Sequence, residues 1–293
     1  DRAGAGAGAG AHRGRYPVLG ATMTIDRLVL PKQINGPAGR FYAIDDDLSP
    51  SVTHVLACIA KPALVGWSAK EERKIVVQAA AKLYADETVA ANLSRATFVA
   101  LLEGELGRTR GHQRKLLKAG EIGTGTHHLI EWHVRKSLGE PVGPEPSVPD
   151  ESMWAFMAWQ DWAKDVTLEP ILCEQIVYSR RYGYAGTMDL LANVRGVPTL
   201  LDWKTGKAVY PEAFLQNVAY QHALIEMGHA AAEAGAIVRL PKTVGDPAFE
   251  VVAVPDDEDL FATFLATLKL WRWWYSNEEK ARQRFERRRS GAA

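Results

Sequence analysis

The sequence predicts a mixed α/β fold, with a mixed β-sheet flanked by helices and a helical region ahead of it. Segments with the helical spacing of apolar residues come first, and three strand-like runs follow between residues 171 and 204. A helix, two more strand-like runs and a last helix complete the order. Helices before, between and after the strand-like runs favour a mixed α/β core over an all-helical or all-β domain.

The composition is that of a soluble globular protein, because 47% of the 293 residues are hydrophobic and 24% are charged. That length allows one large domain or two small ones. The formal net charge is zero, so a nucleic-acid partner would be held by local basic patches. The two cysteines cannot supply a four-cysteine metal site, and so few are typical of a reducing compartment. The sequence has no apolar run of about 18 residues and no secretory signal, so we expect a cytoplasmic protein without membrane contact.

Composition and motifs divide the chain into four regions. Residues 1–22 carry an alternating Ala-Gly run and no methionine, so we expect a disordered low-complexity tail. Residues 23–120 are predicted to form a helical region packed on the core, after irregular structure or short strands up to Asp47. Residues 121–280 contain the predicted core. Residues 281–293 form a basic tail, which is either a solvated helix end or a nucleic-acid contact.

The N-terminal region is predicted to contain three helices. Ser49-Pro50-Ser51 is typical of a helix start, because serine caps the free amides of a first turn. A second helix is predicted over residues 69–92, and Ser94 is expected to cap a third.

A basic segment over residues 108–118 has five basic side chains and no acidic one. It is either the solvated face of a helix or a contact for phosphate groups. Within it, Arg114 and Lys115 are the two residues that we expect to bind a nucleic-acid backbone.

The next helix is predicted over residues 127–138, and the Gly-Thr-Gly-Thr run at 123–126 is interpreted as preceding it. On this helix His127 and Glu131 are four residues apart and share a face. A single helical histidine is more often structural than a metal ligand. A proline-rich loop leads to a helix over residues 151–166, whose aromatic residues we expect in the core rather than on a base-stacking surface.

A β-hairpin is predicted where two apolar runs, residues 188–194 and 198–204, flank an Arg-Gly turn. A turn centred there places Asp189 opposite Asp202. Carboxylates facing each other across a ladder, with Cβ atoms about 5 Å apart, repel, so a divalent cation is expected between them. Strand alternation turns Lys204 to the face of Asp202. A surface hairpin with ordinary ion pairs is the alternative.

The strand before the hairpin, over residues 171–179, carries Glu174, and a turn at 182–183 places this side chain on the face of Asp189. After the hairpin the sequence predicts a helix over residues 211–227, strands over residues 236–240 and 249–254, and a last helix capped by Asp256.

These motifs together resemble the PD-(D/E)XK nuclease superfamily in its RecB-like branch. In chain order the matching motifs are Gly123-Thr124-x-x-His127-x-x-x-Glu131, Glu174-x-x-Val177, Gly186-Thr187-Met188-Asp189, Asp202-Trp203-Lys204 and Gln216-x-x-x-Tyr220. Pro50-Ser51-Val52-Thr53 with Trp67 is similar to the N-terminal element of phage exonucleases and of the mitochondrial genome maintenance exonuclease. The resemblance extends over most of residues 49–270 and implies a restriction-endonuclease-like core.

The resemblance implies a Mg²⁺ or Mn²⁺ ion bound by Asp189 and Asp202, with the Trp203 backbone carbonyl and the His127 ring completing the shell. Lys204 would orient the attacking water, and Glu174 would reach a second metal or hold Lys204. We expect nucleic-acid contacts from Gln216, Tyr220, Ser51, Thr53, Arg114 and Lys115.

The expected function is a Mg²⁺- or Mn²⁺-dependent DNA exonuclease that acts at single-stranded ends in repair, recombination or phage replication, in a bacterial or phage-infected cell. Two features depart from the relatives: the acid at position 202 is Asp rather than Glu, and an iron–sulfur cluster cannot form with two cysteines. The sequence has no helicase motif, so unwinding would need a helicase or recombination partner. The alternatives are a structure-specific endonuclease, a non-catalytic DNA-end-binding module and a metal-stabilised interaction scaffold.

Overall fold

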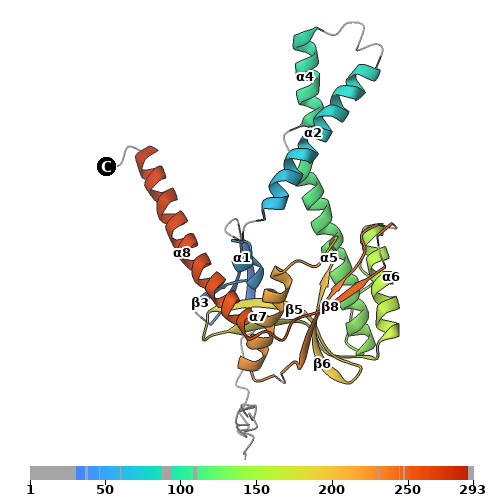
Figure 1. The fold of residues 1–293 in the computed structure, drawn as a ribbon, viewed down its shortest axis with the longest axis vertical. Coiled ribbons are helices and arrows are strands. Elements are labelled where there is room, and N and C mark those ends of the chain that lie inside the picture. Colours follow the sequence, from blue (N-terminus) through green and yellow to red (C-terminus); the bar gives the residue numbers. More distant parts are fainter. Residues whose placement is uncertain are drawn as a thin grey trace, which may run out of the picture.

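The fold is described by a computed structural model (Figure 1). The described residues are 31–36, 39–45, 47–59, 61–86, 94–107, 111–229, 231–243, 245–246 and 248–289. The predicted tail over residues 1–22 and the basic residues Arg108 and Arg110 lie outside them. None of the helices in these ranges is long and apolar enough to cross a membrane.

A five-stranded mixed sheet forms the centre of the molecule, as predicted. Its strands are β4 (Leu168–Ser179), β5 (Tyr184–Val194), β6 (Val197–Lys204), β7 (Ala234–Arg239) and β8 (Glu250–Ala253), in that spatial order. The first three strands are antiparallel, β7 runs parallel to β6, and β8 is antiparallel to β7. The crossover between the parallel strands is a helix, as such a connection requires.

Helices cover both faces of this sheet. On one face, α5 (Gly111–Ser137) and α6 (Asp150–Asp165) enclose a core that includes Leu129, Trp159 and Trp203. On the other, α7 (Glu212–Glu226) and the first turns of α8 (Glu258–Arg289) enclose a second core around Met188 and Phe264. The aromatic residues of α6 are therefore mainly core residues, as expected, since Phe156, Trp159 and Trp162 are buried.

The N-terminal region begins with a small antiparallel sheet, which agrees with the expectation of short strands. It consists of β1 (Lys32–Gly36), β2 (Gly39–Ile44) and β3 (Asp47–Pro50). Helix α1 (Val52–Leu56) follows at the predicted start, where the Ser51 hydroxyl accepts a 3.0 Å hydrogen bond from the His54 amide. Ser51 also bridges Ala185 of β5, which joins this region to the central sheet.

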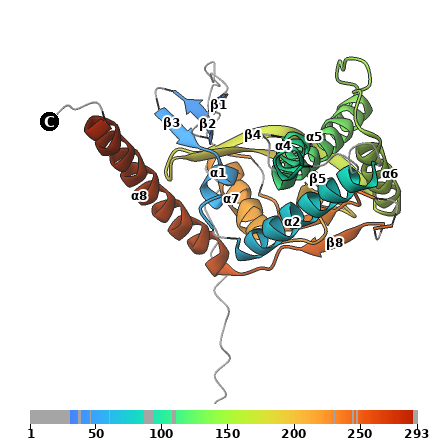
Figure 2. The same ribbon diagram turned by 90° about the horizontal axis from the view of Figure 1, so that it is seen from above.

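A helical arm projects from the body of the molecule (Figures 1 and 2). It contains α2 (Pro62–Ala85), α4 (Arg95–Leu106) and the N-terminal part of α5. Ser94 caps α4 as predicted, with its hydroxyl accepting a hydrogen bond from the Thr97 amide. The second helix starts seven residues earlier than predicted, at Pro62, because proline suits a first helical turn, where its missing N–H costs nothing.

The prediction for the start of α5 is wrong. The helix is continuous from Gly111 and includes the Gly-Thr-Gly-Thr run, whereas the sequence predicts that this run precedes a helix that begins at His127. A Cβ atom at Gly125 would lie 2.7 Å from the Ser152 hydroxyl of α6, so glycine here permits close helix packing. Packing of α5 against α6 thus overrides the weak helix propensity of glycine.

Candidate active site

The hairpin has the predicted register. Its turn residues Arg195 and Gly196 have φ values of +52° and +83°, which is the left-handed conformation that a two-residue hairpin turn requires. The ladder runs from Val194 opposite Val197 to Leu190 opposite Leu201. Beyond this last pair, the carboxylate of Asp189 accepts a 2.7 Å hydrogen bond from the backbone amide of Trp203. Asp189 therefore lies at the end of the paired region, beside the strand that carries Asp202.

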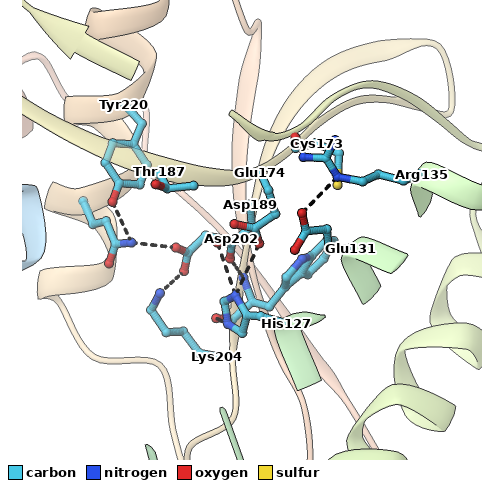
Figure 3. Close-up of polar contacts among 12 residues, drawn as sticks. His127, Glu131, Arg135, Cys173, Glu174, Thr187, Asp189, Asp202, Lys204 and Tyr220 are labelled. Carbon is cyan, nitrogen blue, oxygen red and sulfur yellow. Dashed lines mark hydrogen bonds and ion pairs between the residues drawn. The ribbon is translucent and has the colours of Figure 1, made fainter. Parts of the chain in front are cut away.

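Three side chains converge at this end of the hairpin: His127 from α5, Glu174 from β4 and Asp189 from β5 (Figure 3). One potential ligand atom from each lies within 4.8 Å of the others. The His127 Nδ1 atom is 3.4 Å from Asp189 Oδ1 and 3.8 Å from Glu174 Oε1. The other ring nitrogen, Nε2, is 3.2 Å from the backbone carbonyl oxygen of Trp203.

Glu174 reaches this group through an unusual backbone conformation. The β4–β5 ladder pairs Gln175 with Met188 and Cys173 with Leu190, so Glu174 is opposite Asp189, on the face predicted for it. Its φ is +46°, which is rare for a residue other than glycine. Such conformations cost about 1–3 kcal/mol and persist where the surrounding structure holds them.

Asp202 belongs to a second, adjacent group of side chains (Figure 3). Its carboxylate forms an ion pair with the ammonium group of Lys204. The side-chain amide of Gln216 donates hydrogen bonds of 3.0 Å to Asp202 Oδ1 and 3.3 Å to the Tyr220 hydroxyl. The residues predicted from the sequence to form one metal shell are therefore arranged as two neighbouring groups.

Charge in the first group is balanced by the histidine. Burial would lower the pKa of His127, but the charges of Asp189 and Glu174 outweigh burial and raise it to about 10. Burial raises the pKa of Glu174 to about 7, against the hydrogen bond from His127. Burial also acts to raise the pKa of Asp189, but the positive charge of His127 lowers it. The imidazolium thus supplies the positive charge that the buried carboxylate of Asp189 and the half-buried carboxylate of Glu174 need.

Charge in the second group is balanced by the lysine. Burial raises the pKa of Asp202 to about 6, although the charge of Lys204 opposes the rise. Burial would lower the pKa of Lys204, but the charges of Asp202 and Asp189 outweigh it and raise that pKa. The Lys204 side chain therefore stays an ammonium ion at neutral pH.

A groove of about 650 Å³ opens beside Lys204. Thr53 lines it, whereas Ser51 is only 1% exposed and is engaged in capping α1. Lys61 and Glu212 also line the groove and form an ion pair there. The sequence analysis missed both residues, because they flank motifs without belonging to one.

Arg114 and Lys115 are not brought to this site. Both lie in the first turns of α5, in the helical arm. Lys115 forms an ion pair with Glu71 of α2, and the Arg114 guanidinium donates a 3.4 Å hydrogen bond to the Leu106 carbonyl. Lys118, three residues further on, is 2.7 Å from Glu151 of α6. Acidic residues of neighbouring helices thus lie against this basic segment.

The glycine before Asp189 has a packing role. A Cβ atom at Gly186 would lie 2.5 Å from the Tyr220 ring, so only glycine lets β5 and α7 approach this closely. We expect Gly186→Ala to shift Tyr220 and to lower the free energy of unfolding by about 1–3 kcal/mol, as overpacking does. Thermal melts check this, with Gly143→Ala as the control, because a Cβ atom there meets open space. An unchanged melting temperature for Gly186→Ala would contradict this role.

No protein-family model and no curated protein matches the chain. Among solved structures, it is similar to the alkaline exonuclease LHK-Exo from Laribacter hongkongensis, with 12% sequence identity and a TM-score of 0.34. That alignment covers 56% of this chain and 84% of the exonuclease chain. The structure of LHK-Exo in complex with dAMP is similar at 12% identity and a TM-score of 0.33. That alignment covers 58% of this chain and 85% of the LHK-Exo chain. The similarity is distant.

Proposed function

We propose that the chain is a divalent-metal-dependent deoxyribonuclease of the PD-(D/E)XK type, with its nuclease core in residues 121–280 and an N-terminal region, residues 23–120, ahead of it. The observation that carries this proposal is the convergence of His127, Glu174 and Asp189 beside the ion pair of Asp202 and Lys204. A cation-binding group next to a fixed ammonium ion is suited to a phosphodiester, whose negative charge grows during hydrolysis.

The donor set fits Mg²⁺ or Mn²⁺. Carboxylate and carbonyl oxygens are hard ligands, and an imidazole nitrogen is better tolerated by Mn²⁺. Asp189, Glu174, His127 and the Trp203 carbonyl would hold the ion, with Asp202 beside them. The bound ion supplies acidity to a water molecule and neutralises charge on the phosphate.

Lys204 acts in this proposal as a fixed positive charge. Because its pKa is raised, it donates hydrogen bonds to the phosphate or to the attacking water and does not remove a proton. Asp202 holds the ammonium group in place, and Gln216 orients Asp202 through a 3.0 Å hydrogen bond. The Tyr220 hydroxyl accepts a 3.3 Å hydrogen bond from the same Gln216 amide group, so Asp202, Gln216 and Tyr220 together position the Lys204 ammonium group at the scissile bond.

We further propose that the enzyme is an exonuclease that acts at single-stranded ends in DNA repair, recombination or phage replication. The groove of about 650 Å³ supports this, because Thr53, Lys61 and Leu64 line it together with Lys204, so a strand that lies in it passes the ammonium group. A helicase or recombination protein would supply single-stranded ends.

The test uses labelled linear and circular DNA. With Mg²⁺ or Mn²⁺, linear single strands should be shortened from an end, whereas single-stranded circles should remain intact. EDTA should stop the reaction. Cleavage of circles would show an endonuclease, and binding without cleavage in either metal would show a DNA-end-binding module.

His127 and the adjacent His128 provide a matched pair of variants. His127 is in the metal-binding group, whereas His128 is exposed on α5. We expect His127→Ala to weaken Mn²⁺ binding by about 10- to 100-fold or more, since losing even an outer-shell partner costs that much. His128→Ala should bind Mn²⁺ as the wild type does. Titration calorimetry measures both, and the opposite ranking would mean that the wrong histidine has been assigned.

A further inference from the structure

A second hollow lies beside α1, next to the groove that Lys204 lines. The groove beside Lys204 reaches Ala57, which directly follows the last residue of α1. Ala57 also lines a hollow of about 500 Å³, whose far wall is formed by α8. The side chains that line this hollow include His54, Cys58, Trp271, Trp274, Tyr275 and Glu278. The two depressions thus share one lining residue, Ala57.

The wall of the hollow is made of packed aromatic rings. Trp271 stacks on Tyr275 with ring centroids 4.9 Å apart and planes 16° from parallel. The His54 ring meets Trp271 edge-on at 5.0 Å. Trp271 is buried, whereas Trp274 is 58% exposed. The hollow therefore has a rigid aromatic wall and a large apolar ring that faces solvent.

Charge around the hollow changes along α8. Glu278 lines the hollow, and the helix continues beyond it to Arg289 (Figure 1). In sequence, residues 280–289 contain six basic residues and one acidic residue. A phosphate group is disfavoured beside Glu278, so an uncharged group is the better occupant of this hollow.

We infer that the hollow is a base-stacking subsite for single-stranded nucleic acid. One unpaired base of the strand that passes Lys204 enters the hollow and stacks on Trp274. This rests on the proposed function, because the strand is the substrate of the nuclease. Every base has an aromatic face, so such a site binds without sequence preference.

Trp273 and Trp274 are a matched pair for the test. They are adjacent on α8 and 62% and 58% exposed, but only Trp274 lines the hollow. Affinity for a labelled single strand is measured by fluorescence anisotropy in Ca²⁺ without Mg²⁺ or Mn²⁺, so that binding is read without cleavage. We expect Trp274→Ala to bind about tenfold more weakly, equal to about 1.4 kcal/mol. Trp274→Phe should retain most of the affinity, and Trp273→Ala all of it.

An abasic site moved along the strand identifies the base. An abasic site at one position should weaken binding by the wild-type protein about tenfold. At the same position it should not further weaken binding by the Trp274→Ala variant. Additive losses at every position, equal losses for Trp273→Ala, or no binding of single strands would overturn the subsite. Unchanged DNA affinity in Trp274→Ala with loss of a dimer in sedimentation would assign the hollow to a second copy of the chain and also overturn it.

This readout separates the subsite from the nuclease. Coupling between Trp274 and one base, in a protein that cleaves no DNA with any metal, would support the subsite and reject the proposed function. Metal-dependent cleavage without such coupling would reject the subsite and leave the proposed function standing.

Discussion

Asp189→Asn is expected to lower the rate of metal-dependent DNA cleavage by about 10³-fold, which corresponds to about 4 kcal/mol. Asp189 contacts His127 and accepts the hydrogen bond of the Trp203 amide, so it links the proposed metal ligands to the strand that carries Lys204. Asparagine keeps an oxygen for that amide but removes the negative charge. Single-turnover cleavage in Mg²⁺ measures the loss. Asp161→Asn, on the exposed face of α6, should cleave at the wild-type rate.

Alanine at the same position should behave differently from asparagine. Asp189→Ala leaves the buried amide of Trp203 without its partner, which costs about 1–3 kcal/mol. If Asp189 and Asp202 only repelled each other across the ladder, removing one of them would instead make the metal-free protein more stable. Thermal melts in EDTA should therefore place Asp189→Ala below Asp189→Asn. Wild-type cleavage by Asp189→Asn would falsify the site assignment.

The hairpin could be predicted from the sequence because the residues that specify it are close together in the chain. The Arg-Gly turn fixes the register, and alternation fixes the faces of Asp202 and Lys204. The division of the site into two groups could not be predicted in this way. It depends on where the ladder ends at Leu190 and on the positive φ of Glu174, and both are set by packing between elements distant in sequence.

Two other differences between the sequence-based predictions and the structure also come from packing between elements distant in sequence. The glycines at 123 and 125 have the local pattern of a turn, but in the fold they allow α5 to approach Thr205 and Ser152. The basic segment of α5 lacks acids in sequence, but Glu71 and Glu151 come to it from α2 and α6. The sequence pattern identifies glycines and basic residues in α5. The contacts that these residues make are decided by side chains from other helices and strands.

Metal binding is expected to release protons and to strengthen as the pH rises. Without metal, His127 carries a proton, since its pKa is raised to about 10, and Glu174 is half protonated near pH 7. A cation that binds His127 and Glu174 must displace these protons.

The folding free energy of the metal-free protein should change in the opposite sense to metal affinity. Because the folded pKa of Glu174 is raised to about 7, the folded state holds more protons than the unfolded chain as the pH rises from about 4.3 towards 7. This carboxyl group therefore makes the metal-free protein less stable across that window. Metal binding replaces the proton with a cation, so stabilisation by metal should be largest at the alkaline end.

Between pH 6 and pH 8 the Mn²⁺ dissociation constant should fall about tenfold per pH unit for each proton displaced. Titration calorimetry in two buffers of different ionisation enthalpy counts the protons, with one to two expected at pH 7. His127→Gln should release fewer protons than the wild type, because glutamine has none to lose, whereas His128→Gln should release the wild-type number. A dissociation constant that does not change between pH 6 and pH 8 would mean that the metal does not bind at His127 and Glu174. The three side chains would then form an ordinary ion-pair network, held together by the charge of the His127 imidazolium alone.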